Sequence, residues 1–235
     1  EELTIVKRLS KIQIDGVLIA PSSETKNFDH FRRLQKSGIP VVVFDRDCPG
    51  LEADKVLVDD YFGAFQAVDY LIGTGCKKIA HLGGPLNLST TEQRLQGYLD
   101  ALEKNKVPIK RDHIVHVSGF SHKEAVKATK RLLELPERPD AIFAYNDKIA
   151  ISAMHIAKKT GLQIPDEVSV IGFDDEPHSS FITPSLSTVW QPVYSMGMLS
   201  ARILLSHLKN QNTALDFRKE VFKPELVIRA SSKEK

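Results

Sequence analysis

The sequence predicts an α/β fold with parallel sheets, and two observations support this class. Short runs rich in β-branched residues alternate with amphipathic helical patterns along nearly all of the 235 residues. Several of these runs are apolar at almost every position, which is typical of strands buried on both faces of a parallel sheet. The expected strands lie at 16–20, 41–44, 79–82, 114–117, 141–144, 168–173 and 225–229.

Apolar spacing and capping residues place helices between these strands. After Asp60, residues 61–74 carry Phe, Val, Leu and Ile side chains on one stripe, and Gly75 ends the pattern. The tetrapeptide Ser-His-Lys-Glu at 121–124 has the form of a capping box, in which the first and last residues satisfy each other's backbone N–H groups. We therefore expect one helix to begin after Asp60 and another after the capping serine.

The N-terminal segment lacks a partner strand. Leu3, Val6, Leu9 and Ile12 form a helical stripe that leads into the strand at 16–20, yet no strand precedes this helix. A parallel strand-helix-strand unit needs both of its strands. We infer that N-terminal structure is missing from the chain. Because the first residue is not Met, the sequence leaves open either a removed leader or a trimmed N-terminus.

Composition and charge exclude several functional classes. The net charge is +2, and no run of Lys and Arg is long enough for a basic nucleic-acid-binding surface, so any DNA contact must come from another segment. Cys48 and Cys76 cannot build a disulfide framework and form no zinc motif, which favours a reducing, cytoplasmic compartment. No apolar run approaches the roughly 18 residues of a membrane span.

Common enzyme signatures are absent from the sequence. It contains no nucleophile elbow, zinc-protease helix, Walker loop or dinucleotide-binding glycine motif. His81 and His116 lie inside expected strands and are interpreted as core residues, and Cys48 has no visible base beside it. The three consecutive acids from Asp174 to Glu176 cannot all face one cation. We therefore expect no catalytic activity, no cofactor and no metal.

Polar or glycine residues directly follow several of the expected strands. Asp45, Gly83, Asn146 and Asp174 each stand at or next to the carboxyl end of one strand. In open parallel sheets, ligands bind in the crevice outside these carboxyl ends, where helix N-termini converge as well. The sequence therefore predicts that the carboxylates among them face a polar ligand in this crevice.

Helix capping is the alternative role for such residues. Asp and Asn are common N-caps, so each strand-end residue taken alone fits either role. Asn146 or Asp147 must open the helix that stops at Gly161, and Asp147 is favoured as the cap because it immediately precedes that helix. Asp175 and Glu176 are expected to be solvated loop acids.

Four ordered motifs cover most of the chain. They are GGPLNLSTTEQRLQGYLDAL, RPDAIFAYNDKIAISAMHIAKKTGLQIPDEVSVIGFDD, TPSLSTVWQPVYSMG and PELVIRASS. In order and spacing they resemble the effector-binding core of the lactose/galactose repressor (LacI/GalR) family of bacterial transcription regulators. Several ordered motifs are far more specific than one isolated fingerprint.

This resemblance implies a periplasmic-binding-protein-like fold of type I, in which two doubly wound parallel-sheet lobes are joined by three crossovers and hold a small ligand in the cleft between them. The crossings are expected near 58–60, 191–193 and 218–222. The expected N-terminal lobe is 1–58 and 193–219, lacking its first strands, and the expected C-terminal lobe is 59–192 and 220–235.

The resemblance also implies a set of ligand-binding residues. Arg94 offers a planar fork of donors to paired hydroxyls or a carboxylate, although it could instead be a structural salt-bridge residue within its helix. Phe120 can lie against the apolar face of a sugar or a base. We expect that removing Arg94 or Asp174 weakens binding at least about tenfold and leaves the melting temperature nearly unchanged. The residues at the family's ligand-contact positions are Asp45, Thr90, Arg94, Phe120, Asn146, Asp174 and Gln191.

Two residues bear on the type of ligand that the resemblance implies. Leu88 stands where the purine-binding member of the family has a basic residue, whereas Asn146 matches the sugar-binding members. A sugar or sugar derivative is therefore favoured over a purine.

The resemblance implies the ligand-sensing domain of a LacI-type transcription regulator. It would be a cytoplasmic homodimer without membrane contact, and it would reach operator DNA only through an N-terminal helix-turn-helix absent from this chain. A periplasmic sugar-binding protein of a transporter is the alternative, because it shares the lobes and the cleft. A third candidate, a hydrolase or transferase with an α/β cleft, would need a nucleophile paired with a base at the strand ends, which the sequence does not show.

Overall fold

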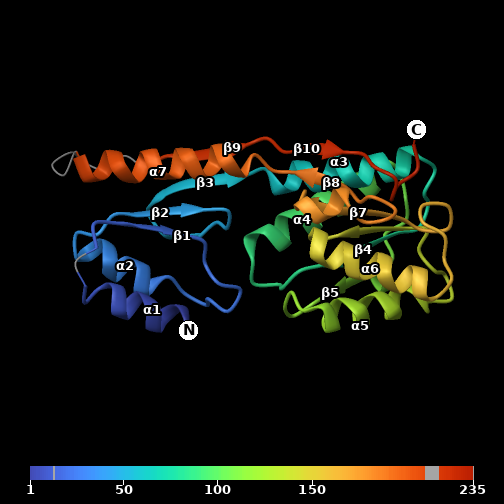
Figure 1. Cartoon of the computed structure of the whole chain (residues 1–235), viewed down its shortest axis with the longest axis horizontal. Helices are drawn as coiled ribbons and strands as arrows, with labels where there is room; N and C mark the ends of the chain where they lie inside the picture. The colour runs from blue at the N-terminus through green and yellow to red at the C-terminus, as the bar shows by residue number, and fades with distance from the viewer. Residues whose placement is uncertain (13, 210–216, 235) are drawn as a thin grey trace. The chain divides into compact units, whose positions relative to one another are not determined.

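The computed structural model describes residues 1–12, 14–209 and 217–234 (Figure 1). These residues divide into two compact units. Unit 1 contains Glu1–Val58, Asn87–Ser89 and Pro192–Phe222, and unit 2 contains Asp59–Leu86, Thr90–Gln191 and Lys223–Lys235. Each unit is built on its own sheet, with helices on both faces.

Unit 1 has a parallel sheet with the strand order β1-β2-β3-β9. Helices α1 and α2 lie on one face of this sheet, and α7 lies along the other (Figure 1). Val42, Val43 and Val56 are fully buried in its centre. The strands are β1 (Val17–Ile19), β2 (Val41–Phe44), β3 (Asp54–Val58) and β9 (Lys219–Phe222), and the helices are α1 (Glu2–Leu9), α2 (Asp29–Lys36) and α7 (Val193–Lys209).

Unit 2 has a larger sheet with the strand order β10-β8-β7-β6-β4-β5, in which β10 is antiparallel to β8 and the other pairs are parallel. The strands are β4 (Ile79–Gly83), β5 (Ile114–His116), β6 (Ala141–Ala144), β7 (Ser169–Asp174), β8 (Ser187–Trp190) and β10 (Glu225–Val227). The helices are α3 (Asp60–Gly73), α4 (Ser89–Lys104), α5 (His122–Leu133) and α6 (Asp147–Lys159), with short 3-10 turns at η1 (Arg111–His113) and η2 (Pro177–Ser180).

The unit 2 core lies between the sheet and α3 with α4. Phe143 and Phe173 project from β6 and β7 onto this face and are fully buried, together with Tyr98 of α4. Helices α5 and α6 cover the opposite face (Figure 1). Burial of such side chains stabilises the fold by about 1.5–3 kcal/mol each. The core therefore fixes the strand ends of unit 2 on a rigid layer.

The α/β class and parallel sheets are confirmed, and each expected strand is present within one or two residues at its ends. Three strands were not expected, and each has a polar sequence that hides it. β3 begins with Asp54 and Lys55, β8 begins with a serine and a threonine, and β9 is an exposed strand whose first residues are Lys219 and Glu220. A periodicity rule based on apolar runs misses such strands.

The helix boundaries agree with the expected caps except at two positions. Ser121 caps α5 by accepting from the Glu124 N–H, so the capping box is confirmed. Asp59, rather than Asp60, caps α3, because its carboxylate accepts from the Phe62 N–H at 2.9 Å. Asp60 is released from capping and is buried. The second exception, at α6, lies in the candidate site.

The N-terminal helix is shorter than its apolar stripe suggests. α1 ends at Leu9, and Val6 is buried against α2, whereas Leu3, Ile5 and Ile12 are exposed. Among the helices in the described ranges, none is long and apolar enough to span a membrane.

Candidate functional site

The carboxyl ends of the parallel strands in unit 2 lie along one edge of its sheet. β6, β7 and β8 run in the same direction as β4, so the residues that follow them come together at this edge. Tyr145 follows β6, Asp174 ends β7, and Gln191 follows β8. α4 contributes Thr90 and Arg94 to the same edge through the contacts described below.

Arg94 is the centre of this edge and is 3% exposed. Its Nε and Nη2 atoms each donate to Oδ1 of Asp60 at 2.7 Å. Its Nη1 donates to the backbone carbonyl of Tyr145 at 2.5 Å and lies 3.8 Å from Oδ1 of Asp174. Helices α3 and α4 and two strand ends are therefore tied together by one guanidinium group.

Two aromatic rings hold the guanidinium plane in place. The Cζ atom of Arg94 lies 3.6 Å from the ring centroid of Phe173 and 4.5 Å from that of Tyr145, which are cation–π distances. Burial alone would lower the pKa of Arg94, but the attraction of Asp60, Tyr145 and Asp174 raises it. Arg94 therefore keeps its charge although it is buried.

Asp174 offers the more accessible carboxylate of the cluster, with its side chain 29% exposed. Its Oδ1 accepts from Nε2 of Gln191 at 2.7 Å. The backbone of Asp174 has φ 113°, a conformation rarely adopted by residues other than glycine. The backbone conformation of Asp174 and its hydrogen bond from Gln191 together fix the position of the carboxylate.

Hydroxyl and aromatic groups continue the cluster around Tyr145. The hydroxyls of Thr90 and Tyr145 share a hydrogen bond of 2.7 Å. The ring of Phe120, in the loop before α5, stacks on Tyr145 with centroids 5.4 Å apart and an interplanar angle of 23°. A flat apolar face therefore lies beside the donors and acceptors of this edge.

Asn146 is the N-cap of α6, and the preference for Asp147 as that cap was wrong. Oδ1 of Asn146 accepts from the Ile149 N–H at 3.0 Å, and the Asn146 amide nitrogen is not part of that bond. Asp147 is instead the first helical residue and is fully buried. It accepts hydrogen bonds from later segments, which makes it unavailable for capping.

The sequence suggested that Asp175 is a solvated loop acid, but the structure shows it paired and largely buried. Its carboxylate forms an ion pair with Nη2 of Arg229 at 2.8 Å, and its side chain is 18% exposed. Glu176 is half-buried, and its N–H donates to Asp147. Within the ranges that the structure describes, no group of three or more His, Cys, Asp or Glu side chains could hold a metal ion.

Asp45 belongs to unit 1, where it follows β2 with φ 65°. Its carboxylate lies 3.6 Å from Nε of Arg46, and its side chain is 37% exposed. No helix begins after it, so it is not a cap. The structure therefore brings six of the seven predicted residues to unit 2, and the role of Asp45 in the same site stays a prediction.

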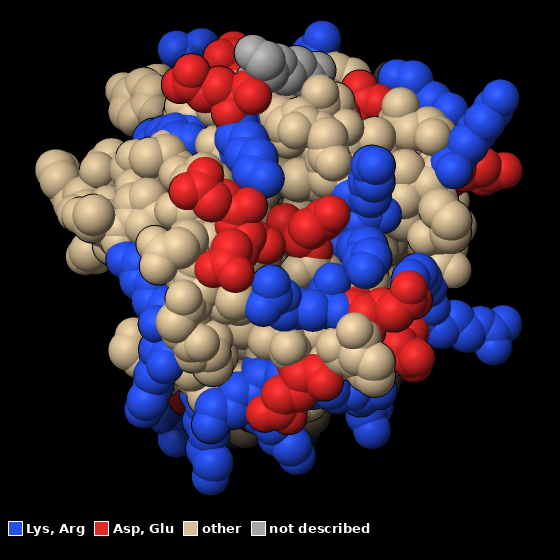
Figure 2. Space-filling view, turned by 90° about the vertical axis from the view of Figure 1, so that its right-hand side faces the viewer, with Lys and Arg blue, Asp and Glu red and all other residues tan. Residues whose placement is uncertain are grey.

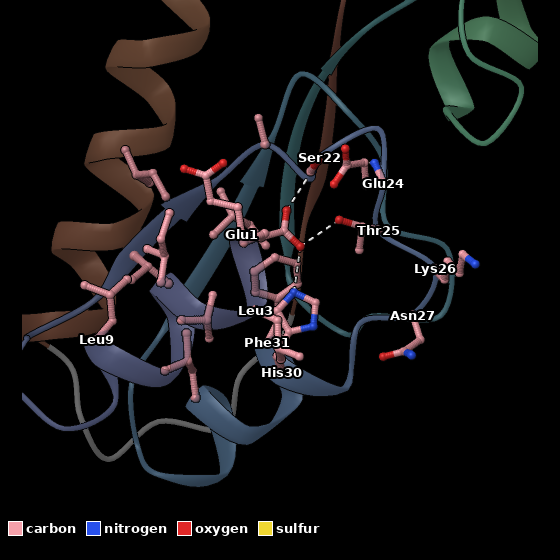
Figure 3. Close-up of a pocket in the computed structure, with 18 residues that line it drawn as sticks. Glu1, Leu3, Leu9, Ser22, Glu24, Thr25, Lys26, Asn27, His30 and Phe31 are labelled. Carbon is pink, nitrogen blue, oxygen red and sulfur yellow. Dashed lines mark hydrogen bonds and ion pairs between the residues drawn. The ribbon is translucent and has the colours of Figure 1, made fainter. Parts of the chain in front are cut away.

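Unit 1 contains a pocket of about 660 Å³ next to α1, β1 and the loop at 22–27 (Figure 3). One of its carboxylates, that of Glu2, accepts from the Ser22 N–H, Thr25 Oγ1 and His30 Nε2 at 2.6 to 2.7 Å. Burial would raise the pKa of Glu2, but these hydrogen bonds hold it below its usual value. Ser22, Thr25 and His30 thus already occupy the Glu2 carboxylate as donors.

Charges of both signs lie on the face of the molecule that Figure 2 presents. Figure 2 shows Lys and Arg side chains intermingled with Asp and Glu on the face that it presents. A nucleic-acid-binding surface would gather positive charge on one face. This face does not have that character.

Sequence reasoning missed two members of the cluster, Asp60 and Tyr145. Two consecutive aspartates, Asp59 and Asp60, open α3, and only one of them can cap it. That repetition was a signal that the other has a different role. Tyr145 directly follows β6, so the rule that selected Asn146 could also have selected it.

Two α/β units, one of them with hydrogen-bonding side chains gathered at its strand ends, define a ligand-binding protein of the periplasmic-binding-protein-like class. The model of the periplasmic binding protein-like domain matches residues 68–232, which is more than half of the chain. The chain belongs to this family and, within it, to the effector-binding domains of LacI-family regulators.

Curated relatives are repressors. The chain is 35% identical over 213 residues to a protein named as the probable transcriptional repressor ExuR of Bacillus subtilis, covering 91% of this chain and 63% of the relative. It is 33% identical over 233 residues to the transcriptional repressor CytR of Escherichia coli, covering 99% of this chain and 67% of CytR. The chain thus spans about two thirds of these relatives.

Solved structures of regulators have the same fold. The regulator CelR in complex with cellobiose matches with a TM-score of 0.87 and 28% identity, over 97% of this chain and 69% of CelR. A LacI-family regulator from Enterococcus faecium with bound ribose matches with a TM-score of 0.86 and 26% identity, over 98% of this chain and 84% of that chain. These similarities favour the regulator over the transport protein and the enzyme considered from the sequence.

Proposed function

We propose that this effector-binding domain senses a sugar or sugar derivative, which it binds at the carboxyl-end edge of the unit 2 sheet. The observation that carries the proposal is the buried guanidinium of Arg94, held by Asp60 beside the partly exposed carboxylate of Asp174. Asp60 and the Tyr145 carbonyl take three of the five N–H groups of the guanidinium, which leaves one donor on Nη1 and one on Nη2. Two such donors next to a fixed acceptor suit vicinal hydroxyl groups, which donate and accept at the same time.

The surrounding side chains provide the remaining contacts that a sugar requires. Phe120 offers an aromatic face to the C–H side of a sugar ring, and the Thr90 and Tyr145 hydroxyls can exchange their mutual hydrogen bond for bonds to the ligand. The amide nitrogen of Asn146 is directed by the cap that its oxygen forms. Hydrogen bonds to charged groups contribute about 1.5–3 kcal/mol each, so a missing hydroxyl would be strongly rejected.

The charge balance of the cluster favours a neutral ligand. Arg94 is already compensated by Asp60 at 2.7 Å and faces Asp174 at 3.8 Å, so these three groups together carry an excess negative charge. Asp175 is neutralised separately by Arg229. An anionic ligand would be repelled by this excess negative charge, which Arg94 alone does not offset. A neutral sugar is therefore preferred over a sugar phosphate.

Titrations with paired sugars test this proposal. D-ribose and cellobiose are the ligands named for the two related structures, and ribose 5-phosphate and hypoxanthine represent an anionic and a purine ligand. Thermal shift and calorimetry should show binding of at least one neutral mono- or disaccharide, with the matching sugar phosphate at least about tenfold weaker. Binding of the phosphate or of hypoxanthine alone would overturn the assignment.

The regulatory role follows from the same site. In this proposal the cytoplasmic protein is a homodimer, and it contacts operator DNA through an N-terminal helix-turn-helix outside this chain. Ligand binding shifts the equilibrium between states of different operator affinity, with a coupling of about 1–3 kcal/mol. Light scattering of the full-length protein, and its operator affinity with and without the sugar, test these two points. A monomer, or an unchanged operator affinity, would contradict them.

A further inference from the structure

Asp147 is a buried carboxylate that serves neither as a helix cap nor as a direct member of the Arg94 cluster. Its side chain is fully buried at the start of α6, where Asn146 provides the cap. Its Oδ2 accepts from the Glu176 N–H at 2.8 Å and from Oγ of Ser179 at 2.6 Å. Its Oδ1 accepts from Oγ1 of Thr188 at 2.6 Å.

One of these donors, Glu176, belongs to the corner at the end of β7, here defined as residues 174–176. The other two, Ser179 and Thr188, belong to η2 and β8. Asp174 and Asp175 have φ values of 113° and 53°, so two consecutive residues other than glycine adopt left-handed backbone. Such conformations persist only where the surrounding structure fixes them. The Asp175 N–H donates to Oγ1 of Thr188 at 3.3 Å, so Thr188 links the corner to Asp147.

The neighbouring strand is shaped to admit this carboxylate. Gly172 of β7 lies against Asp147, and a Cβ atom at position 172 would be 2.2 Å from Oδ1 of Asp147. Any larger residue there would displace the Asp147 side chain. The close approach of Asp147 to β7 is therefore specified by both α6 and the strand that leads into the corner.

We propose that Asp147 is a positioning residue that holds the corner at 174–176 in its strained conformation and so presents the Asp174 carboxylate to the ligand. This inference deepens the proposed function, and it rests on that function where it says that Asp174 contacts a ligand. The anchoring of the corner is a property of the free protein and can be measured without any sugar.

Trp190 provides a local reporter of this anchoring. It is the single tryptophan of the chain, and it is paired with Asp174 in the register of β7 and β8. It is 37% exposed, so its emission responds to changes in the neighbouring backbone and solvent. Amide hydrogen exchange of Asp175 and Glu176 reports the same corner directly.

The test compares Asp147→Ala with Asp147→Asn in the ligand-free protein. Asp147→Ala should speed amide exchange of Asp175 and Glu176 by at least about tenfold and shift the emission of Trp190. Asp147→Asn should recover most of the protection, because its oxygen can accept from Glu176 and Ser179 while its amide donates to Thr188. Ser152→Ala is the matched control: Ser152 is buried on the same helix and bonds to Lys148 and His122 instead.

Exchange in Asp147→Ala equal to that in Ser152→Ala would overturn the proposal. If Asp147→Ala does not fold, Ser179→Ala removes one of the three bonds to Asp147 and leaves Thr188, the acceptor of the Asp175 N–H, in place. This variant should still speed exchange of the Asp175 amide, and unchanged exchange would overturn the proposal equally. D-ribose titrations separate the two claims. If the wild-type protein binds ribose, Asp147→Ala must weaken binding and Asp147→Asn must restore it. If it does not bind, the failure belongs to the assigned ligand, and the exchange data decide the role of Asp147.

Discussion

Nη2 of Arg94 lies 2.7 Å from Oδ1 of Asp60, and both side chains are buried. Removing one partner of a buried pair leaves an uncompensated charge and costs about 3–5 kcal/mol. Arg94→Ala should therefore lower the free energy of unfolding by roughly this amount in urea denaturation. This replaces the expectation from the sequence that the melting temperature would hardly change.

An exposed ion pair in unit 1 provides the control for that experiment. Arg32 and Asp29 lie 2.8 Å apart with side chains 41% and 63% exposed, and such pairs contribute about 0–1 kcal/mol. Arg32→Ala should change stability little. Equal losses in the two variants would show that the Arg94 pair has no special structural role.

Phe120→Ala should weaken sugar binding with a small effect on stability. The Phe120 side chain is half-buried and stacks on Tyr145, and an aromatic face of this kind contributes about 0.5–1.5 kcal/mol beyond its area. Calorimetry should show a loss of affinity of several-fold. Phe181→Ala is the matched control, because Phe181 belongs to the same unit and is 83% exposed. Unaltered affinity in Phe120→Ala would assign Phe120 to the core.

Asp147 should make the folded state more stable as the pH falls. Burial raises the pKa of Asp147 from 3.8 to about 6, against the hydrogen bonds from Ser179, Thr188 and Glu176. Its stabilising contribution is fully present below the unfolded pKa and is lost as the pH rises through about 6. Between pH 8 and pH 4, the wild-type protein should gain about 2 kcal/mol relative to Asp147→Asn. If the stabilities of the two proteins change in parallel with pH, the raised pKa of Asp147 would be contradicted.

His81 should act in the opposite direction. It is fully buried between Tyr98 and Phe143, and its Nε2 has no hydrogen-bond partner. Burial, with a smaller effect of His116, lowers its pKa from 6.5 to about 3. The unfolded chain takes up the proton first, so stability falls as the pH drops below 6.5.

The variant His81→Phe isolates this effect. Between pH 7 and pH 5, His81 should cost the wild-type protein about 2 kcal/mol in free energy of unfolding, and the variant should not show this decrease. Urea denaturation at each pH measures the difference. An acid sensitivity that persists unchanged in His81→Phe would show that His81 is not the group responsible.

Much of the fold follows from local sequence patterns. Apolar runs locate the buried strands β2, β6 and β7, and Ser121 with Glu124 locates the start of α5, because these signals depend on neighbours in the chain. β8 could not be found in this way. Its Ser187 and Thr188 can be buried because groups distant in sequence form hydrogen bonds with them. Ser187 bonds to Arg229 and Ser232, and Thr188 bonds to Asp147.

The gathering of polar side chains at the strand ends of unit 2 was predictable, and their connections to one another were less so. The strand-end rule and the family motifs select Asp174 and Asn146, whose positions follow from the order of the strands. The partner of Arg94 is different. Asp60 lies on another helix, at a distance in sequence that no local pattern encodes. The anchoring by Asp147 likewise depends on residues from η2 and β8.

The most direct test of the account is the affinity of Asp174→Asn for the neutral sugar that the wild-type protein binds. The Asp174 carboxylate is partly exposed, so its neutralisation should leave the melting temperature within a few degrees. Asp166→Asn, an exposed acid of the same unit, is the control. Affinity reduced at least about tenfold, with the control unchanged, is the predicted result. Equal affinities in Asp174→Asn and the wild-type protein would place the ligand elsewhere.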